Sequence, residues 1–139
     1  MNAVFVDTSA LYALVNAADS CHLLAKQAWH DLTAQRQPLV TTNYVVVEAM
    51  ALLQRRHGLA AAIAVHQDFI PLIDVLWADH QTHNLAANLL VFSNRRQLSF
   101  VDCHSFVAMR QHRLTHAFAF DDDFAEQGFT LLPTPPNLR

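Results

Sequence analysis

The segment Ala3-Val4-Phe5-Val6-Asp7-Thr8-Ser9 joins a short apolar run to an acid and two hydroxyl residues. An apolar run of this length, rich in Val and Phe, predicts a buried strand, and the Asp-Thr-Ser sequence after it is typical of a helix start. Asp7 would then stand at the carboxyl end of the strand. A strand that passes directly into a helix is the repeating unit of α/β folds, so this segment predicts that class if the order recurs.

The same order does recur along the chain. Helices are predicted over residues 20–33, 42–57, 59–69, 79–92 and 102–112, and strands over 39–41, 72–77, 117–120 and, at an edge, 129–132. Short buried strands between helices favour a three-layer α/β/α sandwich around a short, mostly parallel sheet. We expect one domain over residues 1–132 and a Pro-rich C-terminal tail over residues 133–139.

The composition limits the classes of protein to which the chain can belong. Its 139 residues are 53% apolar and 15% charged, which excludes a disordered chain and suggests an apolar surface that a partner covers, so we expect an oligomer. No apolar stretch reaches the ~18 residues that span a bilayer, and the first residues lack a basic segment, so we expect a cytoplasmic protein with no membrane segment. A net charge of −3 disfavours nonspecific DNA binding, although bound metal ions would supply positive charge to a nuclease.

Four acidic residues each follow directly on an apolar run: Asp7, Glu48, Asp102 and Asp121. An ionised carboxylate in such surroundings is costly unless it is paired, hydrogen-bonded or bound to metal. Asp7 and Asp121 leave the carboxyl ends of strands, where open α/β sheets place their sites, and the other two acids could point to the same edge. Taken singly, the aspartates could be helix N-caps and Glu48 could pair with a buried arginine. As a set they indicate a site for Mg²⁺ or Mn²⁺ and metal-assisted hydrolysis of a phosphodiester.

The chain resembles a known family at these acids and their neighbours. The matching segments are Val6-Asp7-Thr8-Ser9-Ala10-Leu11, Asp19 with His22 and Ala25, Thr42-Asn43 through Glu48, Leu98-Ser99-Phe100-Val101-Asp102-Cys103, and Phe120-Asp121-Asp122-Asp123-Phe124. In order and spacing they resemble the PIN domain, and more narrowly the VapC-like toxin ribonucleases of bacterial toxin–antitoxin pairs. The resemblance spans nearly the whole chain and departs from the family pattern at Ala119, where a hydroxyl residue is usual.

The resemblance implies a fold, an activity and partners. It implies an α/β/α sandwich, an endoribonuclease that depends on Mg²⁺ or Mn²⁺, a homodimer, and inhibition by a cognate antitoxin bound near the active site. RNA is then the substrate, and the chain the toxin component of a type II toxin–antitoxin system. By motif position, Asp7, Glu48, Asp102 and Asp121 would be the catalytic and metal-binding acids, and Asp123 would be a further metal ligand.

Hydroxyl and arginine side chains near the acids are candidates for binding the substrate. Thr8 and Ser9 could hydrogen-bond a metal ligand or a phosphate. Arg95 and Arg96 closely precede the third acid, and arginine favours bidentate contacts with phosphate, so we expect this pair to anchor the RNA. Surface solvation explains the other arginine pairs equally well, Arg55 with Arg56 and Arg110 with Arg113.

Several other side chains have ordinary structural interpretations. We expect His104 on a helix surface, Trp29 and Trp77 in the core, and Cys21 and Cys103 as buried free thiols. Histidines at ligand-like spacing occur without an H-E-x-x-H motif or a cysteine cluster, which disfavours a zinc site.

Two other function classes are weighed against the nuclease. Asp7 also ends a first strand in phosphatases of the haloacid-dehalogenase type, but that class has a second acid two residues later, where this chain has Ser9, and a lysine deep in the chain. A receiver-like module also needs a late lysine, and Lys26 is the only lysine. The intact acids argue against a degenerate module that only binds a partner. The two glycines lie too far apart for a P-loop or a Rossmann fingerprint.

Overall fold

The computed structural model describes residues 3–135, with a parallel sheet at its centre. Within these residues the sheet has five strands in the order β3-β2-β1-β4-β5, and every neighbouring pair is parallel. The strands are β1 (Val4–Val6), β2 (Leu39–Thr42), β3 (Asp74–Leu76), β4 (His116–Phe118) and β5 (Thr130–Leu132). The expected parallel sheet, with an edge strand near residue 130, is therefore confirmed.

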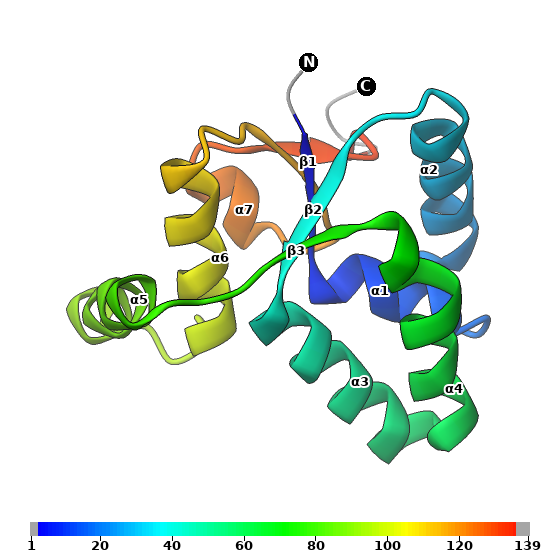
Figure 1. The fold of residues 1–139 in the computed structure, drawn as a ribbon, viewed down its shortest axis with the longest axis horizontal. Coiled ribbons are helices and arrows are strands. Elements are labelled where there is room, and N and C mark those ends of the chain that lie inside the picture. Colours follow the sequence, from blue (N-terminus) through cyan, green and yellow to red (C-terminus); the bar gives the residue numbers. More distant parts are fainter. Residues whose placement is uncertain (1–2, 136–139) are drawn as a thin grey trace.

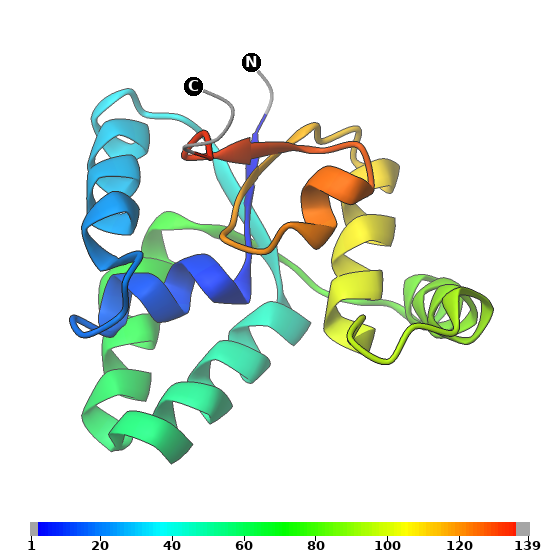
Figure 2. The same ribbon diagram turned by 180° about the vertical axis from the view of Figure 1, so that it is seen from behind.

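Helices cover both sides of this sheet. They are α1 (Thr8–Val15), α2 (His22–Ala34), α3 (Asn43–His57), α4 (Leu59–Ala64), α5 (His80–Ser93), α6 (Phe100–Gln111) and α7 (Asp123–Glu126). Figures 1 and 2 show α1, α2 and α4 on one side of the strands and α5, α6 and α7 on the other. The expected three-layer α/β/α sandwich is confirmed.

The central strand β1 explains where a site can form. Val4, Phe5 and Val6 are all fully buried, because a central parallel strand is covered by helices on both faces. From β1 the sheet extends through β2 and β3 in one direction and through β4 and β5 in the other. The carboxyl ends of β1 and β4 therefore border the crevice at which the strand order reverses, the usual place for a site in an open parallel sheet.

Side-chain caps set the helices that leave this edge. Asp7 caps α1, Thr42 caps α3 and Ser99 caps α6, each by accepting a hydrogen bond from a backbone N–H of the first turn. At the far end of α3, Gly58 has a φ of 95°, which favours glycine, and there the chain turns into α4. The predicted start of α3 and its end near residue 57 are confirmed.

Several predicted boundaries differ from those of the structure. The helix predicted over residues 59–69 is α-helical only to Ala64 and continues as a π-helical turn over Val65–Phe69 and a 3₁₀ turn over Ile70–Leu72. The strand predicted from residue 72 therefore begins only at Asp74. The helix predicted from residue 102 begins two residues earlier, because Ser99 rather than Asp102 is its cap.

The expectations about the burial of Trp77 and His104 are wrong. Trp77, expected in the core, is 79% exposed, because it follows the edge strand β3, which has a neighbour on one side only. His104, expected on a helix surface, is 2% exposed, because its face of α6 packs on Tyr44 of α3 with the ring centroids 4.4 Å apart. Trp29 is half-buried and packs edge-to-face on Phe69 at 5.1 Å, in agreement with a packing role.

The ends of the described chain bear on the predicted domain limits. Pro133, the first residue of the expected tail, is half-buried beside Leu132, and residues 136–139 of that tail lie outside the described residues. No helix within residues 3–135 is long and apolar enough to cross a bilayer.

Candidate active site

Asp7 has one bonded and one unpartnered carboxylate oxygen at the junction of β1 and α1. Oδ2 accepts hydrogen bonds from the Ser9 backbone N–H at 3.1 Å and from Ser9 Oγ at 2.7 Å. Oδ1 is buried and has no hydrogen-bond partner within residues 3–135. Burial raises the pKa of Asp7 to about 7, repulsion from Asp102 and Asp121 adds to this, and the Ser9 hydrogen bonds oppose it. The cap thus fixes one oxygen and leaves the other free for a cation.

Ser9 links this aspartate to the neighbouring strand end. Its hydroxyl donates to Asp7 and also accepts a hydrogen bond of 2.9 Å from the backbone N–H of Phe120. Phe120 directly precedes Asp121, so one small side chain fixes the position of both acid-bearing segments. The expected hydrogen bond from Ser9 to an acid is therefore present.

Three further acids meet beside Asp7. Asp102, Asp121 and Asp123 each offer one carboxylate oxygen within 4.8 Å of the other two. Burial is the largest cause that raises the pKa of each, and repulsion between neighbouring acids adds to it. Asp102 also completes the capping box of α6, because its Oδ2 accepts a 3.2 Å hydrogen bond from the backbone N–H of the cap residue Ser99. Such a cluster is unfavourable without a cation.

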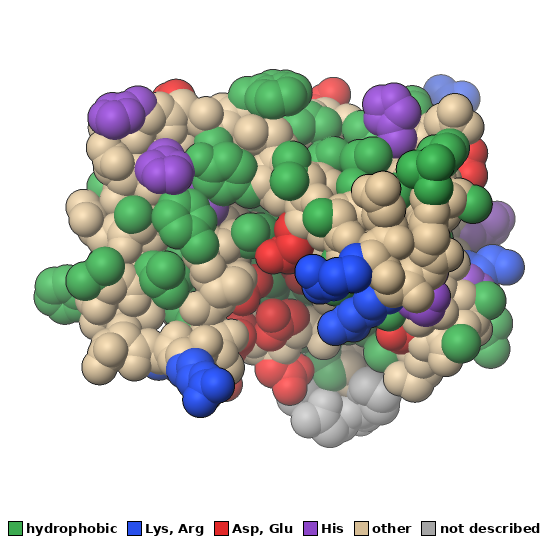
Figure 3. Space-filling model, turned by 90° about the horizontal axis from the view of Figure 1, so that it is seen from below, with side chains coloured by type: hydrophobic (Ala, Val, Ile, Leu, Met, Phe, Trp, Pro, Cys, Tyr) green, Lys and Arg blue, Asp and Glu red, His purple; other side chains and the backbone are tan. Residues whose placement is uncertain are grey.

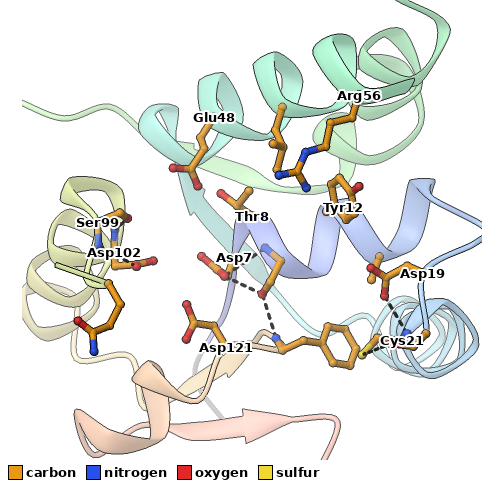
Figure 4. A pocket seen from close by; sticks show the side chains of 16 residues that line it. Asp7, Thr8, Tyr12, Asp19, Cys21, Glu48, Arg56, Ser99, Asp102 and Asp121 are labelled. Atoms are coloured by element: carbon orange, nitrogen blue, oxygen red, sulfur yellow. Dashed lines mark hydrogen bonds between the residues drawn. The ribbon is translucent and has the colours of Figure 1, made fainter. Parts of the chain in front are cut away.

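Glu48 completes the acidic set from above, as Figure 4 shows. It is half-buried on α3, and its repulsion contributes to the raised pKa of Asp102. Within residues 3–135 no arginine, lysine or histidine lies within 4.0 Å of its carboxylate, so the alternative of a buried arginine partner fails. The four predicted acids Asp7, Glu48, Asp102 and Asp121 all line one pocket of about 780 Å³.

The acidic pocket opens at the carboxyl edge of the sheet. Figure 3, seen from below, shows the red acidic side chains gathered in a hollow between the two halves of the molecule. The atoms available to coordinate a metal ion are all carboxylate oxygens, which are ligands that suit Mg²⁺ and Mn²⁺ better than zinc. The unpartnered Oδ1 of Asp7 and the three clustered aspartates fit a hard divalent cation. The described residues thus contain a cluster of carboxylates that could bind a metal ion.

The predicted substrate-binding residues differ in whether they line the acidic pocket. Thr8 lines the pocket, and its buried hydroxyl has no partner within the described chain. Arg95 does not line the pocket; its guanidinium pairs with Asp123 at 3.5 Å and Glu126 at 3.3 Å. Arg96 is exposed and outside the pocket as well.

Other pocket residues were not predicted from the sequence. Arg56, attributed there to surface solvation, lines the pocket together with Tyr12. Cys21 is half-buried at the pocket rather than buried in the core, whereas Cys103 is buried as expected. Spacing on α3 is a signal for Arg56, because residues four and eight positions after Glu48 return to a similar helix face.

Comparisons with known proteins identify the family of this chain. The PIN domain family model matches residues 4–129. The 23S rRNA-specific endonuclease VapC20 of Mycobacterium tuberculosis, in strains CDC 1551 / Oshkosh and ATCC 25618 / H37Rv, is 42% identical over 130 residues, which cover 91% of this chain and 95% of the relative.

Two solved structures are also similar. The crystal structure of M. tuberculosis VapC20, described as a sarcin–ricin loop cleaving toxin, superposes with a TM-score of 0.81 at 36% identity over 91% of this chain and 96% of that one. The structure of PAE2754 from Pyrobaculum aerophilum has a TM-score of 0.64 at 19% identity over 94% and 90% of the two chains, a likeness of fold alone. The predicted resemblance is confirmed, and the chain belongs to the PIN-domain family.

Proposed function

We propose that the protein is a metal-dependent endoribonuclease, the toxin of a type II toxin–antitoxin pair, and that it hydrolyses a phosphodiester in the sarcin–ricin loop of 23S rRNA. The substrate follows from the VapC20 similarity, which extends over nearly the whole of both chains. The observation that carries the chemistry is the free, buried Oδ1 of Asp7 beside the acidic cluster.

The acids Asp7, Glu48, Asp102 and Asp121, with Asp123, would hold Mg²⁺ or Mn²⁺. When bound, such an ion supplies an activated water and neutralises charge that develops on the phosphate. Without it, the acids would repel the RNA backbone and one another. The function of this chain's residues is to hold several carboxylate oxygens close together in spite of that repulsion.

The surrounding side chains position the acids and the substrate. Ser9 fixes Oδ2 of Asp7, and so directs Oδ1 toward the cation site. The unpartnered, buried hydroxyl of Thr8 would hydrogen-bond a metal ligand or a phosphate, as predicted from the sequence. Arg95 holds Asp123 in place through their ion pair, and Arg96, exposed beside it, remains the RNA contact expected at the outer edge.

Protein partners belong to the same proposal. As the family resemblance implies, the protein forms a homodimer, is inhibited by a cognate antitoxin and acts in the cytoplasm, where ribosomal RNA is found. An apolar groove of about 510 Å³ between α3, α5 and α6 adjoins the acids, since Glu48 lines both, and this supports a protein partner near the site. Its apolar members include Val47, which is 65% exposed.

The phosphatase and receiver alternatives have no support in the site. Both classes need a lysine beside the acids, whereas Lys26 is exposed on α2 and does not line the acidic pocket. Ser9, which stands where the phosphatase class has its second acid, is a hydrogen-bond donor to Asp7.

In the decisive experiment the purified protein is incubated with 23S rRNA and with a sarcin–ricin hairpin RNA in Mg²⁺ or Mn²⁺, and the ends of the RNA products are mapped. We expect one cut, lost in EDTA and in Asp7→Asn. Cutting of other RNA while the hairpin stays intact would reject the substrate. Cleavage by Asp7→Asn at the wild-type rate would reject the assigned acids.

A further inference from the structure

We infer that Arg56 binds an RNA phosphate that flanks the one held at the acids, and that Tyr12 keeps Arg56 in position for it. This rests on the proposed function, because it names a second contact with the same substrate. Arg56 lies in the last turn of α3 and lines the pocket that contains Asp7. Among the lysine and arginine residues between positions 3 and 135, it alone does so.

Arg56 lies at a distance from the acidic cluster. About two helical turns, ~12 Å along the axis, separate it from Glu48 on α3. Leu52, between them, lines the pocket too, so one face of α3 forms this wall. Figure 4 shows Arg56 above Tyr12, on the other side of the pocket from Asp102. A phosphate held by metal–oxygen bonds of about 2 Å lies against the acids, and we therefore assign Arg56, on the opposite side of the pocket from Asp102 (Figure 4), to a neighbouring phosphate.

The charge of Arg56 is available to an anion. Five carboxylates line the pocket, those of Asp7, Asp19, Glu48, Asp102 and Asp121. None of them, and no other carboxylate within residues 3–135, lies within 4.0 Å of the Arg56 guanidinium. Of the arginine pair expected to anchor the RNA, Arg95 is bound to two acids of its own, and Arg96 does not line this pocket.

Tyr12 explains why the guanidinium stays apart from the acids. The Arg56 Cζ lies 5.8 Å from the centre of the Tyr12 ring. The Tyr12 hydroxyl is 2.9 Å from Nε2 of His57, and the two rings lie 5.7 Å apart, so the tyrosine is itself held in place. A ring contact attracts the cation while its N–H donors remain free, and the planar fork of arginine matches a phosphate. The pocket therefore has a cationic side chain on the side opposite Asp102 (Figure 4).

The first test compares Arg56→Gln with Arg55→Gln on an RNA that the wild-type protein cuts. Arg55 is exposed on the same helical turn but does not line the pocket, so it is a matched control. We expect Arg56→Gln to raise KM about 10-fold with kcat within about 2-fold, and Arg55→Gln to change neither. The slope of log KM against log salt should fall by about 0.7–0.9, the value for one phosphate.

The second test identifies the RNA group. Single neutral methylphosphonate linkages are placed, one at a time, on either side of the cleaved bond. In the wild type one flanking linkage should cost about 10-fold in KM, and the same linkage should cost Arg56→Gln almost nothing. Additive effects at every linkage, or a fall in kcat without a change in KM, would overturn the inference.

The positioning role of Tyr12 has its own readout. Tyr12→Leu should raise KM as Arg56→Gln does, and Tyr12→Phe, which keeps the ring, should restore it. If the sarcin–ricin hairpin remains uncut, the proposed substrate is wrong, and the inference needs a test that does not depend on cleavage. That test is the affinity for a 12-nucleotide single-stranded RNA, measured by fluorescence anisotropy. A weaker affinity for Arg56→Gln than for Arg55→Gln supports it, and equal affinities reject it.

Discussion

Asp7 and Asp79 each cap a helix through a side-chain hydrogen bond, yet the two carboxyl groups differ in acidity. Asp79 caps α5 by accepting a 2.8 Å hydrogen bond from Thr82 N–H, and Asp7 caps α1 by accepting one of 3.1 Å from Ser9 N–H. Hydrogen bonds from Thr82 lower the pKa of the exposed Asp79, whereas burial raises the pKa of Asp7 to about 7. The local motif is the same, so the surroundings make the difference: solvent in one case, a closed sheet edge with other acids in the other.

The largest expected effect is a difference in RNA cleavage rate between variants of the two cap residues. Asp7→Asn should lower the rate of RNA cleavage by at least about 1,000-fold, because the uncharged amide is a poor ligand for a hard cation. Asp79→Asn should leave the rate unchanged, since asparagine caps a helix as well as aspartate does. Cleavage rates with saturating Mg²⁺, together with circular dichroism spectra of both variants, measure this. Equal losses in the two variants would remove the functional distinction between the caps.

The second expected effect concerns the stability of the metal-free protein. The folded-state pKa of Asp7 is raised above its unfolded value of 3.8, so folding favours the protonated form. The cost of ionising Asp7 is absent below pH 4, grows as the pH rises from about 4 to 7, and reaches at most about 4 kcal/mol. The difference in unfolding free energy between Asp7→Asn and the wild type, in EDTA, should therefore increase over that range in favour of the variant.

Urea unfolding at pH 5 and pH 8 measures this difference. Adding Mg²⁺ at pH 8 should stabilise the wild type more than Asp7→Asn, because a bound cation offsets the buried charge. Asp79→Asn serves as the control and should follow the wild type at both pH values. A pH-independent difference between Asp7→Asn and the wild type would contradict the raised pKa of Asp7.

A smaller effect is expected when the anchor of Asp7 is removed. Ser9→Ala deletes the 2.7 Å hydrogen bond to Oδ2 and also the acceptor for Phe120 N–H. Because the hydrogen bond from the Ser9 hydroxyl lowers the pKa of Asp7, its loss should shift the pH–rate profile to higher pH, and the rate at neutral pH should fall about 10-fold. Profiles that superimpose would show that Ser9 does not tune the acid.

The smallest effect is expected at the exposed cap. Asp79→Ala removes the side-chain acceptor for Thr82 N–H, and should slightly lower the melting temperature without changing the cleavage rate. Thermal denaturation followed by circular dichroism, with Asp79→Asn as the variant that keeps the cap, checks this. A change in the cleavage rate would mean that α5 contributes to the site.

Much of the candidate site could be predicted because each acid occurs in an unusual local context. Asp7, Glu48, Asp102 and Asp121 directly follow apolar runs, and all four line one pocket of the structure. Their catalytic and metal-binding roles stay predictions. The local sequence does not identify Arg56 in this way, because its neighbours are those of an ordinary helix. Arg56 lines the pocket only because it lies on the face of α3 that borders it.

The errors in burial have the same origin. His104 and Trp77 both have apolar neighbours in the sequence, yet one is 2% and the other 79% exposed. Hydrophobic pattern reports what a helix or strand tends to bury, but the exposure of one side chain depends on whether another element covers it. An edge strand leaves Trp77 uncovered, and α3 covers His104 through Tyr44.

The sequence by itself determined the α/β class, the family, and the strands and helices apart from a few boundaries and the short helix α7, because these follow from periodicity, caps and motif order along the chain. Only the tertiary structure decided which oxygen of Asp7 is free, which arginine is paired and which faces the acids. Charge and burial depend on distances between segments that are far apart in the chain, and those distances are fixed only when the sheet closes and its helices pack.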